Sequence, residues 1–279
     1  MDNRAIGYID SGLGGLTVVK AALKRLPNEA VYYLGDTARM PYGPRSQAEV
    51  ITFTRQMIQF LVEQKVKMVV IACNTATAAA LTVMQNEFKI PILGVIAAGA
   101  KTAIERTQNK MVGVIATQGT VKMDSYVEAI NQNATDVDVY QLAVPEFVTL
   151  VESGVTDDLT IQQVVDRNMK AFPNAKIDTL ILGCTHFPLL ESNIKNTMGA
   201  GVTIVDAGAE TVTSVAKQLM QLDLNHQNDN FVDHHKDRYY TTGNVSRFKL
   251  LGEQWLERND LHVQRLALID QKLCLDEVI

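Results

Sequence analysis

The chain has 279 residues, with 26 basic and 31 acidic side chains, a formal net charge of −5, and 20% charged against 47% hydrophobic residues. This length is typical of about two domains, and the composition excludes a disordered or fibrous chain. The chain is mildly acidic and has no dense run of basic residues, which disfavours a nucleic-acid-binding surface. Polar residues interrupt the longest uncharged stretch (68–86), which disfavours a membrane-spanning helix. The N-terminal residues do not show the pattern of a secretory signal.

Short apolar segments alternate with helical patterns along the first third of the chain. We expect strands at 5–10, 30–34, 67–72 and 90–95. Apolar residues at helical spacing predict helices at 16–25, 48–64 and 75–87. Because the predicted strands are almost continuously apolar, they are typical of parallel sheets buried on both faces.

The same alternation then starts again. Further strands are expected at 110–116, 138–142, 178–182, 203–205 and 239–242. Further helices are expected at 146–154, 157–171, 212–221 and 248–258, and the polar stretch 227–237 is predicted to be a surface loop. Two pairs of segments look like distant copies, 5–19 with 111–123 and 68–81 with 179–191. We therefore expect two similar α/β domains with mainly parallel sheets, one formed by 1–97 plus 207–279 and the other by 98–206.

Three cysteines are present, Cys73, Cys184 and Cys274, and this odd, low number does not indicate a disulfide framework. By default each would be a small buried hydrophobic residue. Cys73 and Cys184, however, both follow an apolar strand and precede a helix. Ligands bind at the carboxyl ends of parallel strands, and a helix N-terminus favours a thiolate. The two thiols are thus predicted to face each other across one cleft, as a proton acceptor and a proton donor.

Other chemistries are disfavoured by the spacing of the same residues. Cys73, Cys184 and His186 lack the paired ligand spacing of a zinc site. A nucleophile formed by Cys184, His186 and Asp10 would leave Cys73 unexplained. The glycines near Asp10 do not complete a dinucleotide fingerprint, and no phosphate-binding P-loop motif occurs. Taken alone, Asp10 could be a turn residue, and Glu152 a solvated charge on a helix.

Five motifs carry a family resemblance. They are IDSGLGGLTV (9–18), YLGDTARMPYG (33–43), IACNTATA (71–78), LGCTHFPLL (182–190) and VDAGAET (205–211). Together they resemble the aspartate/glutamate racemase family, and among its members those that act on glutamate.

The resemblance implies two α/β domains with the active site in the cleft between them, and a homodimer. It also implies an isomerase that interconverts L- and D-glutamate without a cofactor or metal. D-glutamate is a peptidoglycan precursor, so the setting would be cell-wall synthesis in the bacterial cytoplasm. Open alternatives are an aspartate racemase, another racemase or lyase of this fold, and a non-catalytic amino-acid-binding module.

The resemblance also implies roles for individual residues. Cys73 would take the α-proton of D-glutamate and Cys184 that of L-glutamate, assisted by Asp10 and His186, while Glu152 would act through another residue. The substrate would be held by Asp10, Ser11, Tyr42, Gly43, Asn74, Thr75, Thr185 and His186, with further contacts from Thr117 and Thr120. In this interpretation the Tyr42 hydroxyl faces the cleft, and Cys274 has no role.

Overall fold

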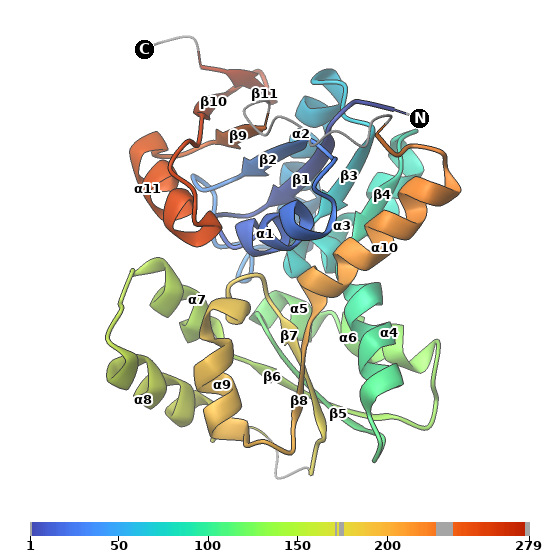
Figure 1. The fold of residues 1–279 in the computed structure, drawn as a ribbon, viewed down its shortest axis with the longest axis vertical. Helices are drawn as coiled ribbons and strands as arrows, with labels where there is room; N and C mark the ends of the chain where they lie inside the picture. The colour runs from blue at the N-terminus through green and yellow to red at the C-terminus, as the bar shows by residue number, and fades with distance from the viewer. Residues whose placement is uncertain (1, 171, 173–175, 227–236, 277–279) are drawn as a thin grey trace.

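The computed structural model describes residues 2–170, 172, 176–226 and 237–276 of the chain. They form two β-sheets, each with helices on both faces, placed one above the other in Figure 1. The predicted loop at 227–237 falls almost wholly outside the described residues, which resume at Asp237. In the described part of the chain, no helix combines the length and the apolar character needed to cross a membrane.

The first sheet has seven strands in the order β11-β10-β9-β2-β1-β3-β4. Their bounds are β1 Ile6–Asp10, β2 Val31–Gly35, β3 Met68–Ile71, β4 Ile92–Gly94, β9 Arg238–Thr241, β10 Val263–Ile269 and β11 Lys272–Leu275. Every pairing is parallel except that of β10 with β11. In the centre of the sheet, Ile9 is in register with Leu34 and with Ile71.

The second sheet has four parallel strands in the order β6-β5-β7-β8. Their bounds are β5 Met111–Ala116, β6 Asp138–Ala143, β7 Thr179–Gly183 and β8 Thr203–Asp206. The first sheet contains the same order in β2-β1-β3-β4. The two halves therefore share a topology in which β1 corresponds to β5 and β3 to β7, as the paired sequence segments predict.

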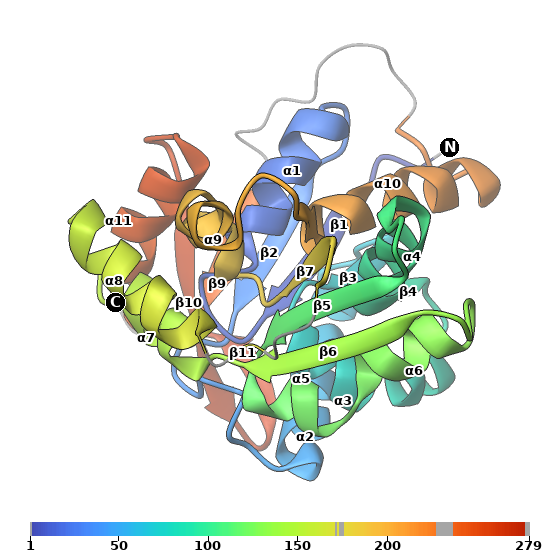
Figure 2. The same cartoon turned by 90° about the horizontal axis from the view of Figure 1, so that it is seen from below.

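Helices cover both faces of both sheets, because alternate strand residues point to opposite sides. Around the first sheet lie α1 Leu16–Arg25, α2 Gln47–Glu63, α3 Asn74–Glu87, α10 Ala207–Gln221 and α11 Val245–Leu256. Around the second lie α4 Ile96–Arg106, α6 Ser125–Asn131, α7 Pro145–Glu152, α8 Asp158–Met169 and α9 Glu191–Met198. Figure 2 shows α7 and α8 on one flank of the second sheet and α4 and α6 on the other.

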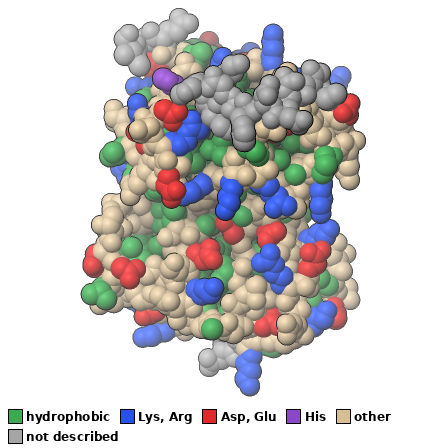
Figure 3. Space-filling model, in the orientation of Figure 1, with side chains coloured by type: hydrophobic (Ala, Val, Ile, Leu, Met, Phe, Trp, Pro, Cys, Tyr) green, Lys and Arg blue, Asp and Glu red, His purple; other side chains and the backbone are tan. Residues whose placement is uncertain are grey.

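The two short helical elements, α5 Gln118–Lys122 and the 3₁₀ turn η1 Phe187–Leu190, directly follow β5 and the Cys184 loop. The chain passes between the sheets at β4–α4 and at β8–α10. We propose domain boundaries at 97/98 and 206/207 on this basis, since the first lies in the opening turn of α4 and the second between β8 and α10. On the face in Figure 3, basic and acidic side chains are interspersed rather than separated by sign.

The predicted strands and helices of the alternating pattern are present, but helix α4 and the C-terminal hairpin β10–β11 were not predicted. The turn of this hairpin has positive φ at Asp270 and Gln271. Such a turn usually carries Asn-Gly or Asp-Gly, so the sequence lacked the usual hairpin signal. The helix predicted at 212–221 begins earlier, at Ala207, because Asp206 accepts hydrogen bonds from the backbone N–H groups of Gly208 and Ala209.

Candidate active site

Cys73 caps the helix that follows the central strand β3. Its sulfur accepts a hydrogen bond from the backbone N–H of Ala76 at 3.5 Å, and its thiol donates to the Ser11 hydroxyl at 3.7 Å. Burial, with the nearby Asp10 carboxylate, raises the pKa of Cys73 to about 12. The sequence-based expectation that the helix N-terminus lowers this pKa is therefore wrong, because desolvation outweighs one N–H donor.

Cys184 follows β7 and is joined to a chain of two further side chains. Its sulfur lies 3.7 Å from Nδ1 of His186, and Nε2 of His186 lies 2.8 Å from Oε1 of Glu152. Burial alone would lower the pKa of His186, but its hydrogen bonds to Cys184 and Glu152 raise it to about 10. As an imidazolium, His186 donates from both ring nitrogens and places a positive charge beside the Cys184 sulfur.

Asp10 lies at the end of β1, fully buried, and organises the loop around it. Its Oδ2 accepts hydrogen bonds from the backbone N–H groups of Gly12 and Gly15 at 3.2 and 3.0 Å. Thr185 donates to its other oxygen at 3.4 Å, which links the two halves of the molecule. Burial raises the pKa of Asp10, and the charge of His186 opposes this shift.

Hydroxyl and amide groups from both halves meet beside Cys73. Thr75 is hydrogen bonded to Thr117 at 2.8 Å and to Thr120 at 3.4 Å. Tyr126 donates to the carbonyl oxygen of the Asn74 side chain at 2.7 Å. This contact leaves the Asn74 amide N–H₂ free to point its donors elsewhere, and the threonine hydroxyls supply further donors for a carboxylate.

One small cavity between the two sheets brings most of the predicted residues together. Its lining consists of Ser11, Pro41, Tyr42, Gly43, Cys73, Asn74, Thr75, Thr117, Val148, Cys184, Thr185 and His186. Both thiols therefore face the same space, one from each half. The cavity volume is about 20 Å³, which is room for roughly one water molecule.

Three predicted residues lie behind this cavity rather than in its lining. Asp10 is bound to backbone N–H groups, Glu152 reaches His186 from outside, and Thr120 supports Thr75 and Thr117. Tyr42 lines the cavity, but its hydroxyl donates to the buried Asp36. The expectation of a cleft-facing Tyr42 hydroxyl is therefore corrected.

Two lining residues, Pro41 and Val148, were not singled out from the sequence. Pro41 belongs to the motif 33–43, and the Met40–Pro41 peptide bond is cis. Val148 lies on α7, two residues before Leu150 on a helix whose apolar residues mostly pack into the core. An apolar residue on such a helix carries no signal of its own, so only the fold reveals that Val148 borders the site.

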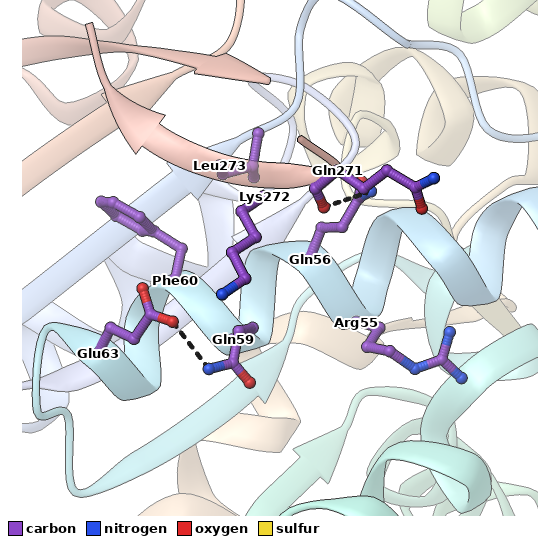
Figure 4. Close-up of a pocket in the computed structure, with 8 residues that line it drawn as sticks. All are labelled: Arg55, Gln56, Gln59, Phe60, Glu63, Gln271, Lys272 and Leu273. Carbon is purple, nitrogen blue, oxygen red and sulfur yellow. Dashed lines mark hydrogen bonds between the residues drawn. The ribbon is translucent and has the colours of Figure 1, made fainter. Parts of the chain in front are cut away.

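A larger pocket of about 370 Å³ lies elsewhere, between α2 and the β10–β11 hairpin (Figure 4). Two of its polar side chains are hydrogen bonded within the protein: Gln56 donates to the carbonyl of Gln271, and Gln59 donates to Glu63. Neither of the two cysteines, nor His186, borders it. The candidate active site is thus the small cavity and not this larger pocket.

Comparison with known proteins identifies the family of the chain. Residues 15–215 match the family described as Asp/Glu/Hydantoin racemase. The glutamate racemase of Lactiplantibacillus plantarum is 46% identical over 267 residues, which cover 96% of this chain and 97% of that protein. The chain belongs to the Asp/Glu/hydantoin racemase family.

Solved structures of family members have the same fold. A glutamate racemase of Bacillus anthracis superposes with a TM-score of 0.91 at 40% identity, covering 96% of this chain and 99% of that one. The glutamate racemase of Francisella tularensis, in complex with D-glutamate, superposes with a TM-score of 0.86 at 33% identity, covering 96% and 98%. This racemase-family enzyme therefore shares its overall fold with both relatives.

The close approach of Gly14 to the Cys184 loop yields a sharp prediction for this enzyme. A Cβ atom on Gly14 would lie 2.3 Å from Oγ1 of Thr185 and 2.6 Å from Nδ1 of His186. Gly14→Ala should therefore displace His186 from Cys184 and lower kcat/KM for glutamate by about a hundredfold. Gly201→Ala, where a Cβ meets nothing within 4 Å, is the matched control and should stay within about twofold of wild type. Equal activities would contradict the assigned role of the His186 position.

A second prediction concerns pH. Glu152→Gln removes the anion that helps to raise the pKa of His186, so the imidazolium is lost at a lower pH. The alkaline fall of kcat/KM, expected near pH 10 in the wild type, should move down by roughly one to two pH units. Glu146→Gln on the same helix, where Glu146 pairs with Arg167 instead, should leave the profile unchanged. The same alkaline limb in all three proteins would rule out this role for Glu152.

Proposed function

We propose that the protein interconverts L- and D-glutamate without a cofactor, by a two-base mechanism. The observation that carries the proposal is that Cys73 and Cys184 line one cavity from opposite halves of the molecule. Racemisation requires a base on one face of the α-carbon and an acid on the other. Two thiols at equivalent strand ends supply both, and the relatives' names supply the substrate.

The resting protonation states favour one thiolate and one thiol. The pKa of Cys73, raised to about 12, keeps this group protonated at neutral pH. The imidazolium of His186 favours the thiolate of Cys184. With L-glutamate, Cys184 takes the α-proton and Cys73 delivers its own proton to the opposite face of the carbanion. D-glutamate reacts in reverse from the form in which Cys73 is the thiolate, so the two forms interconvert with each turnover.

The site also contains groups suited to holding the substrate. The hydroxyls of Ser11, Thr75, Thr117 and Thr185 and the amide of Asn74 can donate to the two carboxylates. Asn74 and Thr75 begin α3, and a helix N-terminus attracts anions. Because these donors are fixed before the reaction, they also stabilise the charge that develops beside the α-carbon.

Substrate access requires movement. A cavity with room for roughly one water molecule cannot hold glutamate. We infer that the two halves separate to admit the substrate and close again to exclude water, which strengthens every electrostatic interaction in the site. The hydrogen bonds from Thr185 to Asp10 and from Thr75 to Thr117 join the halves, so they break and reform in each cycle.

The biological setting is part of the proposal. D-glutamate is a peptidoglycan precursor, so we place the enzyme in cell-wall synthesis in the bacterial cytoplasm, where its three free cysteines would stay reduced. The family resemblance further suggests a homodimer, which light scattering at several protein concentrations tests.

The decisive experiment is incubation with L-glutamate or L-aspartate in D₂O without added cofactor, followed by optical rotation and by NMR of the α-position. Loss of rotation with α-deuteration for glutamate alone is the expected result. Activity with aspartate instead would reassign the substrate. Binding without any exchange would indicate a non-catalytic module and would overturn the proposal.

A further inference from the structure

Helix α11 reaches across from the first half to the end of α7 in the second. The Arg247 side chain donates from Nη2 to the backbone carbonyl of Glu152 at 2.8 Å. Glu152 is the last residue of α7, and the last carbonyls of a helix have no partner within the helix. A cation placed there also complements the negative end of the helix dipole.

Besides Arg247, the end of α7 is held by the core packing of Leu150 and Val151 and by the Ser153 hydroxyl, which donates to the Leu150 carbonyl. Phe147 and Leu150 are the buried residues of this short helix, and all residues from 153 to 160 are exposed. At Gly154, the second residue after the helix, a Cβ atom would have nothing within 4 Å. The position of Glu152 therefore depends on what holds the last turn, and Arg247 is bound to that turn.

Arg247 is itself held in place by the contacts at the start of α11. Its backbone N–H donates to the side chain of Asn244, which caps α11, at 2.8 Å. The next residue, Phe248, is buried against Tyr33, with ring centroids 6.0 Å apart. Near the other end of α11, Trp255 meets the ring of His186 edge-on at 6.3 Å. One helix thus contacts both members of the Glu152–His186 pair.

We propose that Arg247 is a positioning residue for racemisation. By holding the end of α7, it keeps the Glu152 carboxylate hydrogen bonded to His186, and so keeps the charged imidazole ring beside the Cys184 sulfur. The proposal rests on the function proposed above. Arg247 does not border the small cavity. Instead it borders, with Glu152 and Met40, an outer pocket of about 350 Å³. The contacts of Cys73, by contrast, are to Ser11 and Ala76 and do not involve α7.

Only Cys184 is linked to α7, through His186 and Glu152, so loss of Arg247 should change the chemical reactivity of Cys184 and not that of Cys73. A general loosening of the structure would affect both cysteines. If Arg247 positions Glu152, then Arg247→Ala weakens the hold on His186 and moves its positive charge away from the Cys184 sulfur. Cys184 should then react more slowly with an alkylating agent. A short pulse of iodoacetamide, followed by mass spectrometry of the two cysteine peptides, should then give a several-fold lower ratio of Cys184 to Cys73 labelling. General opening of the cleft would instead speed the labelling of both thiols, because they share one cavity.

Kinetics complete the test. Arg247→Ala should lower kcat/KM for glutamate by about tenfold, and Arg247→Lys, which keeps a cationic donor, should restore most of the loss together with the labelling ratio. Lys249→Ala removes a cation of the same helix that pairs with Glu253 instead, and should match wild type in both assays.

The proposal is overturned if Arg247→Ala keeps kcat/KM within about twofold of wild type, if its labelling ratio is unchanged, or if both cysteines are labelled faster. A wild-type enzyme inactive on glutamate would refute the proposed function instead. The labelling ratio would still test the positioning role in that case, because it needs no turnover.

Discussion

Replacing either Cys73 or Cys184 with alanine is expected to lower racemisation of glutamate by at least about a thousandfold. Each thiol serves one face of the α-carbon, so neither can substitute for the other. Polarimetry, starting from each enantiomer separately, measures the loss. Cys274 lies outside the cavity, and Cys274→Ala is the matched control, with activity expected within about twofold of wild type.

The two variants should also differ in which enantiomer exchanges its α-proton. Cys73→Ala keeps the base for L-glutamate, so in D₂O it should exchange L-glutamate without inverting it. Cys184→Ala should do the same for D-glutamate alone. A single variant that racemises at a near-normal rate would refute the two-base mechanism, and exchange of the opposite enantiomers would reverse the assignment of the two thiols.

Replacing His186 with asparagine is expected to lower kcat/KM by about a hundredfold. Asparagine can still offer an N–H donor toward Cys184, but it carries no positive charge and does not reach Glu152 as the imidazole ring does. Thiolate absorbance near 240 nm at neutral pH should fall in the variant, because the cation that favours ionised Cys184 is gone.

The control for His186 is His262→Asn, at an exposed histidine near the start of β10, which should change neither activity nor absorbance. If His186→Asn instead kept both the thiolate absorbance and the rate of the wild type, His186 would not be the group that stabilises the Cys184 thiolate. The helix ends and backbone donors would then have to account for it.

Much of the fold follows from sequence pattern, since apolar strands alternate with amphipathic helices in both halves. The equivalent positions of Cys73 and Cys184 in the two halves could be predicted because each cysteine follows a buried strand. The strand order that the two sheets share agrees with this prediction. The β10–β11 hairpin was not readable, because Asp270 and Gln271 adopt a turn conformation that these residue types do not signal.

The site was predictable as a set of residues but not as an electrostatic arrangement. Helix capping at Cys73 suggested a lowered pKa, whereas burial beside Asp10 raises it to about 12. The Tyr42 hydroxyl was expected to face the substrate, yet it donates a hydrogen bond to Asp36. Arg247 had no sequence signal at all, because its role depends on contact between residues 95 positions apart. Burial and long-range contact, which local patterns do not encode, account for all three.

The central claim, two bases acting on opposite faces, is tested most directly by following L-glutamate with wild-type enzyme in D₂O during the first few per cent of conversion. The D-glutamate formed should carry deuterium at the α-carbon, since Cys73, after exchange with D₂O, delivers a deuteron. The remaining L-glutamate should keep its original α-proton. Deuterium in the remaining L-glutamate at the same rate as product appears, or D-glutamate that retains the substrate's own proton, would show a single base serving both faces and would contradict the account.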